Sequence, residues 1–520
     1  MYSLLIKNGL VVDGSGKPPK ILDISVEADK IVNIDEKINV KARNTIDAEG
    51  KLVTPGFIDI QNHSDSYWQI FDNPGLHSLI TQGYTTILIG NCGASLAPLL
   101  SKEALLSIQK WHDLGGTNIN WQSFSEYINE LSKKRFACNI ASLVGYSTLR
   151  RGVVGDQIRS LEKEELEALK RILRESMEAG AFGLSSGLSY SHEIIISELE
   201  LYELAKIVKE KQALFSIHLR SEGQEVIEAV DEALDIAKNT EVNLKISHLK
   251  LRNKANWDKF EQVVDHLDNS YHKGVNVHFD VYPYDTIWQP LYSYLPKWAI
   301  EGGRKLMLKQ LSDSVQKNKI LMYLNSTGIK FVDLVIASTA NRLNFVGKTL
   351  GQIAKNLEVA SEEALLHLIE NGGSEVLVFE KNLDQKQVEK LALHPLSFIA
   401  TDGAGFSDKQ PGKLVHPRCF GTTPKFLNIA TNNGMEIEKA VKKLTSGPAE
   451  KIGLKDRGRL KIGYFADILI IDRNELRDLA TYNNPYQFSR GFTNVFTNGK
   501  LVFSDGKFTE ALPGYVLRKT

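Results

Sequence analysis

The stretch Pro55-Gly-Phe-Ile-Asp-Ile-Gln-Asn-His-Ser-Asp65 places polar side chains directly after a run of apolar ones. From Val53 to Ile60 the chain mixes β-branched and apolar residues without strict alternation, which is typical of a buried parallel strand. His63 and Asp65 then follow the expected end of this strand. In a (β/α)8 barrel the residues that follow the strands meet at one rim, where active sites form. The stretch therefore predicts a barrel strand that delivers possible metal ligands to that rim.

Length and composition limit the classes of protein that this chain can represent. Its 520 residues predict two or three domains, or one large barrel with an appendage. Lys plus Arg and Asp plus Glu both number 63, so overall charge gives no reason to expect binding to nucleic acid or to a membrane. The chain has few cysteines. It has neither a signal-peptide pattern nor an apolar run of membrane-spanning length. We therefore expect a cytoplasmic protein.

Both ends of the chain carry short β-runs that are separated by turn pairs. Asn8-Gly9 and Asp13-Gly14 separate such runs near the start, and Asn498-Gly499 does so near the end. Asn-Gly and Asp-Gly are strong hairpin signals. The pattern predicts one small β-sandwich that is discontinuous in sequence, built from residues 1–54 and 455–520.

Between these ends, apolar strand-like runs alternate with amphipathic helical patterns, as in repeated βα units. Helices are expected over 161–179, 197–211 and 224–238. The expected strands are 55–61, 84–91, 137–144, 181–185, 213–218, 242–248, 275–281 and 397–401. Eight such strands predict an α/β fold, a (β/α)8 TIM-like barrel over residues 55–454. The interval from about 286 to 395 is too long for one βα connection. It is expected to be an inserted lid segment with helices over 349–357 and 361–371 and a β-run over 331–337.

Possible metal ligands follow several of the expected strands. Cys92, His218, His248 and His63 stand at or just beyond strand ends, and Asp402 follows the last strand. Zinc binds Cys, His and carboxylate ligands, and a carboxylate beside a metal can take a proton from water. Taken singly, each of these residues is more often a packing or hydrogen-bonding residue. Their coincidence at one barrel rim favours a metal site.

The chain resembles the N-acyl-D-amino-acid deacylases, or D-aminoacylases, of the amidohydrolase superfamily over nearly its whole length. The motifs that carry this resemblance are Pro55-Gly-Phe-Ile-Asp59, Gln82-Gly-Tyr-Thr-Thr86, Gly90-Asn-Cys-Gly-Ala-Ser95, Leu184-Ser-Ser-Gly187, Tyr282-Pro-Tyr284, Thr401-Asp-Gly403 and His416-Pro-Arg418. The Asn-Cys-Gly element is specific to this branch, since most relatives bridge their metals with a modified Lys or a Glu.

The resemblance implies a role for each matching residue near the metal. Cys92, His218 and His248 match the ligands of a tight Zn2+ site. Asp402 matches the general base, which would also bind a second, weaker metal. His63 matches the second His of the family's His-x-His motif.

The resemblance also implies the residues that hold substrate. Lys250, Tyr282 and Arg418 match substrate-binding positions, and an Arg suits a carboxylate by paired, charge-assisted hydrogen bonds. Tyr190 and Trp288 are predicted as further substrate-binding residues.

Two departures from the family pattern change these expectations. Gln61 replaces the first His of His-x-His and is a poor zinc ligand, so we expect one tight zinc and a weakened second site. Trp288 stands where the family usually has small residues, and its indole is expected either to close the pocket or to stack on an apolar acyl group.

The leading hypothesis is a zinc-dependent hydrolase that cleaves the amide of a small-molecule N-acyl-D-amino acid, with Asp402 as general base and acid. One alternative is an amidohydrolase that acts on a cyclic amide or a lactone. Another is a degenerate relative that binds a ligand without hydrolysis. The oligomeric state is left open.

Overall fold

A barrel of eight parallel strands forms the centre of the described part of the chain. The computed structural model describes residues 2–101, 104–105, 119–190, 192–300, 303–339, 343–407 and 412–520. The barrel strands are β6 (Phe57–Asp59), β7 (Tyr84–Ile89), β8 (Asn139–Ser142) with its continuation β9 (Val144–Gly145), β10 (Gly183–Gly187), β11 (Leu214–His218), β12 (Asn243–Ile246), β13 (Val277–Val281) and β17 (Ser397–Ile399). Neighbouring strands pair in parallel. The predicted α/β barrel is therefore confirmed.

The barrel closes where its first and last strands end. Asn62 and Gly403 form a parallel bridge, and Asp402 N donates a hydrogen bond to Gln61 O over 2.9 Å. Asp59 reinforces this junction, because its carboxylate accepts bonds from Thr401 N and Oγ1 at 3.0 and 2.5 Å. The two strand ends that carry predicted site residues are thus tied together.

The barrel strands are buried along their length, as expected for strands covered by helices. The predicted helices 161–179, 197–211 and 224–238 are observed as α5 (Lys163–Glu178), α6 (Glu198–Glu210) and α7 (Val226–Thr240). Helix α6 begins after Ser197, whose hydroxyl accepts the Glu200 N–H over 3.3 Å as an N-cap. The helices outside the insertion are α1 (Gln69–Asp72), α2 (His77–Ile80), α3 (Phe124–Ser132), α4 (Tyr146–Val154), α5 (Lys163–Glu178), α6 (Glu198–Glu210), α7 (Val226–Thr240), α8 (Phe260–His272), α14 (Gln385–Leu393), α15 (Arg418–Asn432), α16 (Ile437–Leu444) and α17 (Ser446–Ile452). No helix among the described residues is both long and apolar enough to cross a membrane.

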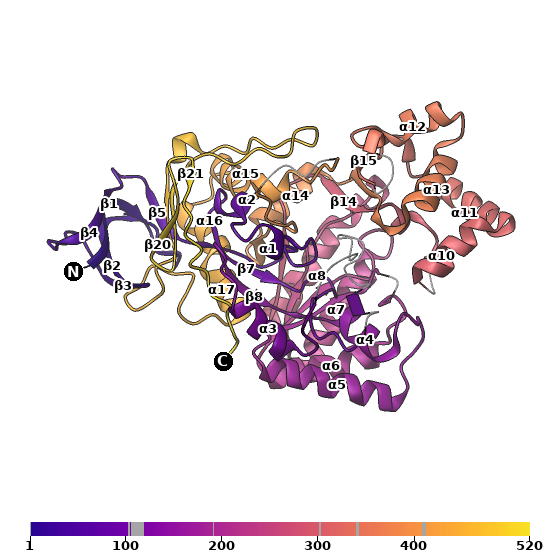
Figure 1. Ribbon diagram of the computed structural model, residues 1–520, viewed down its shortest axis with the longest axis horizontal. Coiled ribbons are helices and arrows are strands. Elements are labelled where there is room, and N and C mark those ends of the chain that lie inside the picture. The colour runs from indigo at the N-terminus through magenta and orange to yellow at the C-terminus, as the bar shows by residue number, and fades with distance from the viewer. Residues whose placement is uncertain are drawn as a thin grey trace.

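Strands from both chain ends join in one sheet, as the sequence predicts. Its order is β21-β20-β19-β18-β5-β1-β2-β3, with β4 paired to β1. The strands are β1 (Tyr2–Val11), β2 (Lys20–Glu27), β3 (Lys30–Asp35), β4 (Ala42–Asp47), β5 (Leu52–Pro55), β18 (Ile468–Ile471), β19 (Phe492–Thr497), β20 (Lys500–Ser504) and β21 (Lys507–Phe508). The sheet lies at one end of the molecule (Figure 1). The domain bounds 1–54, 55–454 and 455–520 stay a prediction.

The opening stretch differs from the single strand that was expected. Leu52–Pro55 pairs with β18 in the terminal sheet, whereas Phe57–Asp59 pairs with β7 in the barrel. Gly56 lies between the two strands, and a Cβ there would come within 2.0 Å of Thr85 Oγ1. The chain therefore passes from one sheet to the other at a position that only glycine fits.

The insertion contains its own small antiparallel sheet, in the order β14-β16-β15. Its elements are β14 (Thr286–Pro290), α9 (Lys297–Ile300), α10 (Gly303–Ser312), α11 (Ser314–Ser326), β15 (Val335–Ser338), α12 (Leu350–Leu357), α13 (Ser361–Gly372) and β16 (Leu377–Lys381). Helices α12 and α13 match the predicted helices, while β16 was not predicted. Helices α10 to α13 project from the side of the barrel, opposite the terminal sheet (Figure 1). Closure of this segment over the barrel mouth stays a prediction.

Candidate active site

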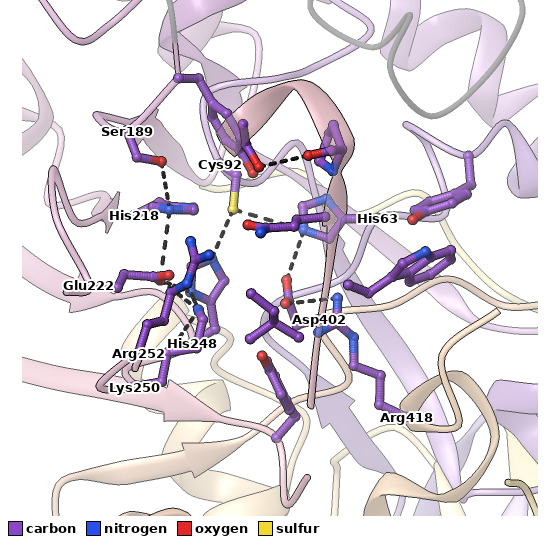
Figure 2. A pocket seen from close by; sticks show the side chains of 18 residues that line it. His63, Cys92, Ser189, His218, Glu222, His248, Lys250, Arg252, Asp402 and Arg418 are labelled. Atoms are coloured by element: carbon purple, nitrogen blue, oxygen red, sulfur yellow. Dashed lines mark hydrogen bonds and ion pairs between the residues drawn. The ribbon is translucent and has the colours of Figure 1, made fainter. Parts of the chain in front are cut away.

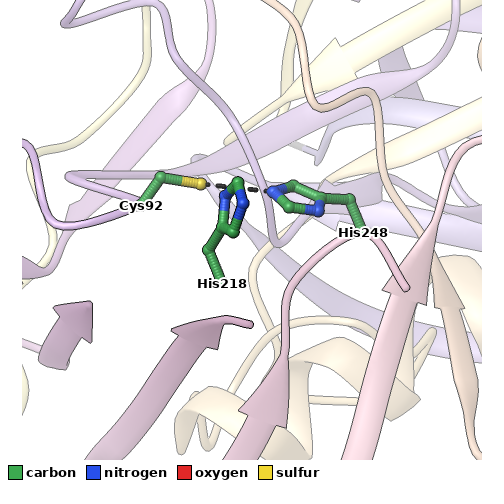
Figure 3. Close-up of side chains that lie close together, drawn as sticks. All are labelled: Cys92, His218 and His248. Carbon is green, nitrogen blue, oxygen red and sulfur yellow. Dashed lines mark hydrogen bonds between the residues drawn. The ribbon is translucent and has the colours of Figure 1, made fainter. Parts of the chain in front are cut away.

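Cys92, His218 and His248 come together at the carboxyl ends of three barrel strands, β7, β11 and β12. One possible ligand atom from each lies within 4.8 Å of the other two, and all three residues are buried. Cys92 Sγ is 3.4 Å from His248 Nε2, and the two imidazole centroids are 4.4 Å apart (Figure 3). One sulfur and two nitrogens at this spacing are a donor set that zinc prefers.

The backbone at three of the predicted residues has an unusual conformation. Cys92, His248 and Asp402 have φ angles of 53°, 37° and 45°. Positive φ is uncommon for residues other than glycine, and such residues cluster at functional sites. Each of them follows a barrel strand, so the turn of the chain directs its side chain into the space above the barrel.

The electrostatics of this cluster favour a metal-binding thiolate. Burial alone would raise the pKa of the Cys92 thiol. The positive charge of His248 and hydrogen bonds from His218, His248 and His63 outweigh burial and hold the pKa well below its usual value. A thiolate is the form of cysteine that binds metals. The residues present therefore fit a zinc ion.

Glu222 orients the two histidines, and sequence reasoning missed it. Its Oε1 lies 3.1 Å from His248 Nδ1, 3.7 Å from His218 Nε2 and 2.5 Å from Lys250 Nζ. Lys250 Nζ lies 2.7 Å from the same Nδ1 and also donates to Glu222 and to His248 O. Because Glu222 and Lys250 hold the ring at Nδ1, its Nε2 faces Cys92 Sγ at 3.4 Å, the side on which a metal would bind. The spacing of Glu222 four residues after His218 was the available signal.

A second group of possible ligands shares Cys92. His63, Cys92 and Asp402 each offer an atom within 4.8 Å of the other two. Asp402 Oδ1 lies 3.1 Å from His63 Nε2, and Asp402 Oδ2 lies 3.0 Å from a terminal nitrogen of Arg418. Burial would raise the pKa of Asp402, but the charges of Arg418 and His248 and the bond from His63 hold it well below its usual value. Asp402 is therefore an ionised acceptor.

Asp65 and Gln61 of the opening stretch do not line the pocket. Asp65 Oδ2 accepts the Gly90 N–H over 2.9 Å and supports the loop that leads to Cys92. Gln61 is fully buried, and its Nε2 donates to Cys92 Sγ over 3.1 Å. Its Oε1 accepts from Lys245 Nζ over 2.5 Å.

The predicted substrate-binding residues line the same space, and Figure 2 shows Lys250 and Arg418 beside the possible metal ligands. The Arg418 guanidinium lies 4.5 Å from the Tyr282 ring centroid and 6.0 Å from that of Trp288. Trp288 stacks on Tyr67 with centroids 5.1 Å apart, and Tyr190 lies 5.1 Å from the His218 ring. The buried guanidinium of Arg418 therefore lies near two aromatic rings, in the same pocket as the possible metal ligands.

One pocket gathers every predicted site residue. Its lining includes His63, Cys92, Tyr190, His218, His248, Lys250, Tyr282, Trp288, Asp402 and Arg418. It also includes Tyr67, Ser189, Glu222 and Arg252, which sequence reasoning did not single out. Ser189 Oγ lies 2.9 Å from His218 Nε2. Tyr67 and Ser189 are close in sequence to His63 and Tyr190, and that proximity was the only signal for them.

Known proteins resemble this chain along its whole length. A profile of the amidohydrolase family matches residues 44–273 and 429–503. An N-acyl-D-glutamate deacylase of Alcaligenes xylosoxydans xylosoxydans is 29% identical, with 99% of this chain and 96% of that protein aligned. The crystal structure of N-acyl-D-glutamate deacylase from Bordetella bronchiseptica superposes on this chain with a TM-score of 0.85, 27% identity and 99% of each chain covered. That structure contains zinc and a phosphonate inhibitor that mimics the tetrahedral intermediate of the reaction. A D-aminoacylase structure gives a TM-score of 0.84, with 27% identity and full coverage of both chains. That enzyme has a binuclear metal centre, in which one metal activates and a second attenuates.

Proposed function

Because this chain belongs to the amidohydrolase family, we propose that it hydrolyses the N-acyl amide bond of N-acyl-D-amino acids, or of closely similar amides, to a carboxylate and a D-amino acid. The observation that carries this proposal is the meeting of two groups in one pocket. A buried Cys-His-His cluster lies beside a buried Asp402–Arg418 pair. The first suits a catalytic metal, and the second offers a proton acceptor and a cation for the substrate.

Cys92, His218 and His248 would hold one zinc ion. When bound, zinc polarises the amide carbonyl and lowers the pKa of water. His63 and Asp402 belong to a second, weaker site, because Gln61 directs a donor N–H at Cys92 in place of a lone pair. The active form is therefore a one-zinc enzyme.

Asp402 moves the proton. Its carboxylate is buried and ionised, so it accepts a proton from the attacking water and later donates it to the leaving nitrogen. His63 and Arg418 hold the two carboxylate oxygens at 3.1 and 3.0 Å, which fixes the direction of that transfer. Because one oxygen of Asp402 faces Arg418, the catalytic carboxylate lies close to the cation that binds the substrate.

Arg418, Lys250 and Tyr282 bind the substrate carboxylate. Arg418 is the principal cation, because one of its terminal nitrogens is paired with Asp402 while its buried Nε has no hydrogen-bond partner, whereas Lys250 donates to Glu222 and to His248 O. A carboxylate fixed on one side of the metal lets the amide approach with one face only, which selects one enantiomer. Trp288 and Tyr67 form an apolar wall on which the acyl group stacks, and Tyr190 bounds the pocket beside His218.

A substrate screen separates this proposal from the cyclic-amide alternative. The zinc-loaded protein is expected to turn over N-acyl-D-amino acids and to leave hydantoins, dihydropyrimidines and lactones intact. Turnover of the cyclic compounds alone would reverse this assignment. Zinc-free protein isolated from zinc-supplied cells would favour the degenerate, ligand-binding alternative. We also assign the protein to a reducing compartment such as the cytoplasm, because three cysteines are too few and too odd in number for a secreted disulfide framework.

A further inference from the structure

Lys245 lies inside the barrel on β12, and none of its side chain is exposed. Its Nζ lies 2.6 Å from Asp280 Oδ1, 2.5 Å from Gln61 Oε1 and 3.4 Å from Ile60 O. An ammonium group has three protons to donate and no lone pair to accept a bond. All three neighbours are acceptors, so each proton of Lys245 has a partner.

These contacts fix which way the Gln61 amide faces. Its Oε1 accepts from Lys245 Nζ and from Ser247 Oγ at 2.5 and 3.2 Å. A flipped amide would turn its two N–H donors toward the ammonium, which cannot accept them. Gln61 Nε2 is therefore directed at Cys92 Sγ, 3.1 Å away.

The orientation of Gln61 matters for the second group of ligands. His63, Cys92 and Asp402 still lie within 4.8 Å of one another, so three donors to a second metal remain. A fourth protein ligand would hold a second metal more tightly than three donors and a water, and the oxygen is the atom of a carboxamide that can provide it. In this chain that oxygen faces Lys245, and the thiolate receives an N–H bond instead.

We propose that Lys245 is a positioning residue that locks the Gln61 amide with its N–H toward Cys92 and so limits the site to one metal ion. The inference rests on the proposed one-zinc function and extends it to metal regulation. Excess zinc should not attenuate this enzyme, because a second ion would meet an N–H group at Cys92 in place of a further oxygen ligand. Asp280 completes the lock by holding Lys245, and it also accepts the His248 N–H over 3.0 Å.

A purely structural role for Lys245 predicts a different outcome. A buried Lys–Asp pair that only supports the barrel would change stability when it is removed, but not the number of metal ions bound. The positioning role predicts a change in metal stoichiometry. Zinc binding to a second site is therefore the readout that separates the two roles.

Two variants of the full-length protein test the lock. Gln61→Glu keeps the side-chain size and the bonds to Lys245 and Ser247, but turns an oxygen toward Cys92. Lys245→Met combined with Asp280→Asn removes both charges and releases the Gln61 amide. Lys443→Met is the matched control, because it removes a buried lysine whose partners are His394 O and the oxygens of Ser397.

Equilibrium dialysis against buffered zinc should show one ion per chain for the wild type and for Lys443→Met. Both test variants should bind a second zinc more tightly, on the order of 10–100-fold, which is the usual range for changes around metal ligands. Their hydrolysis should also fall as zinc rises above one equivalent. If Gln61→Glu folds and its second-zinc affinity equals that of the wild type, the lock is overturned, whether or not the double variant folds. Failure of the proposed function is distinguishable from this, since it would appear as the absence of zinc or of turnover in the wild type.

Discussion

Replacing Asp402 with Asn tests the proton-transfer role, because Asn has nearly the same shape and cannot accept the proton. General acid–base catalysis contributes about 10²–10⁴-fold to a rate. We therefore expect kcat for an N-acyl-D-amino acid to fall by about that factor, or by about 3–5 kcal/mol of barrier. The tight zinc should remain, since Cys92, His218 and His248 do not depend on Asp402.

The same change leaves Arg418 buried without its counter-ion, which costs about 3–5 kcal/mol of stability in comparable cases. Asp467→Asn is the matched control for this effect. Asp467 pairs with Arg457, and their side chains are 4% and 1% exposed, in a part of the structure outside the pocket. The control should lose stability but keep kcat per folded molecule. Urea unfolding, bound zinc and kcat should be measured for both variants, and a zinc-loaded Asp402→Asn protein that keeps more than about a tenth of the wild-type kcat would refute the role of Asp402.

Three further changes probe the pocket and the fold. Arg418→Met should lower kcat/KM about 10–100-fold more for an N-acyl-D-amino acid than for the matched amide without a carboxylate, because charged hydrogen bonds contribute about 1.5–3 kcal/mol; equal losses would argue against carboxylate binding. Burial raises the pKa of Glu200 to about 7 from 4.5, so the folded state holds its proton more tightly than the unfolded state, and stability is lost as pH rises from 4.5 to 7. In Glu200→Gln, up to about 3 kcal/mol of this pH-dependent loss in the free energy of unfolding should disappear, as measured by urea unfolding at several pH values. If the free energy of unfolding falls with pH as steeply in the variant as in the wild type, Glu200 is not the cause of the loss. Trp288→Ala removes an indole that contacts Tyr67 and Phe379; it should cost about 3–5 kcal/mol of stability and shift kcat/KM toward bulkier acyl groups, and an unaltered acyl preference would exclude Trp288 from the acyl site.

The barrel and most of its rim were predictable because they depend on local patterns. Each strand is a short apolar run that ends in a polar residue, and parallel strands bring such ends to one rim. Cys92, His218, His248 and Asp402 could therefore be placed together from their positions after strands. Their distances and the positive φ angles behind them were not predictable, since they depend on how neighbouring strands are staggered.

The parts that were missed depend on contacts between distant segments. The β14–β16 pairing joins residues about ninety positions apart, from Trp288 to Phe379, and the apolar run of β16 gives no sign of its partner. The split at Gly56 arises because two sheets compete for one continuous apolar run. Lys245 was passed over for a similar reason: a lysine in a strand suggests an exposed face, and only the barrel interior brings Asp280 and Gln61 to it.

Hydrolysis of paired N-acyl-D- and N-acyl-L-amino acids, by protein whose zinc has been counted, is the most direct test of whether this chain is a D-specific deacylase. The panel should cover acidic, apolar and aromatic side chains and short and long acyl groups. We expect turnover of D-enantiomers only, with one zinc ion per chain. Equal turnover of both enantiomers, or no turnover across the panel by the zinc-loaded protein, would show that this chain is not a D-specific zinc deacylase.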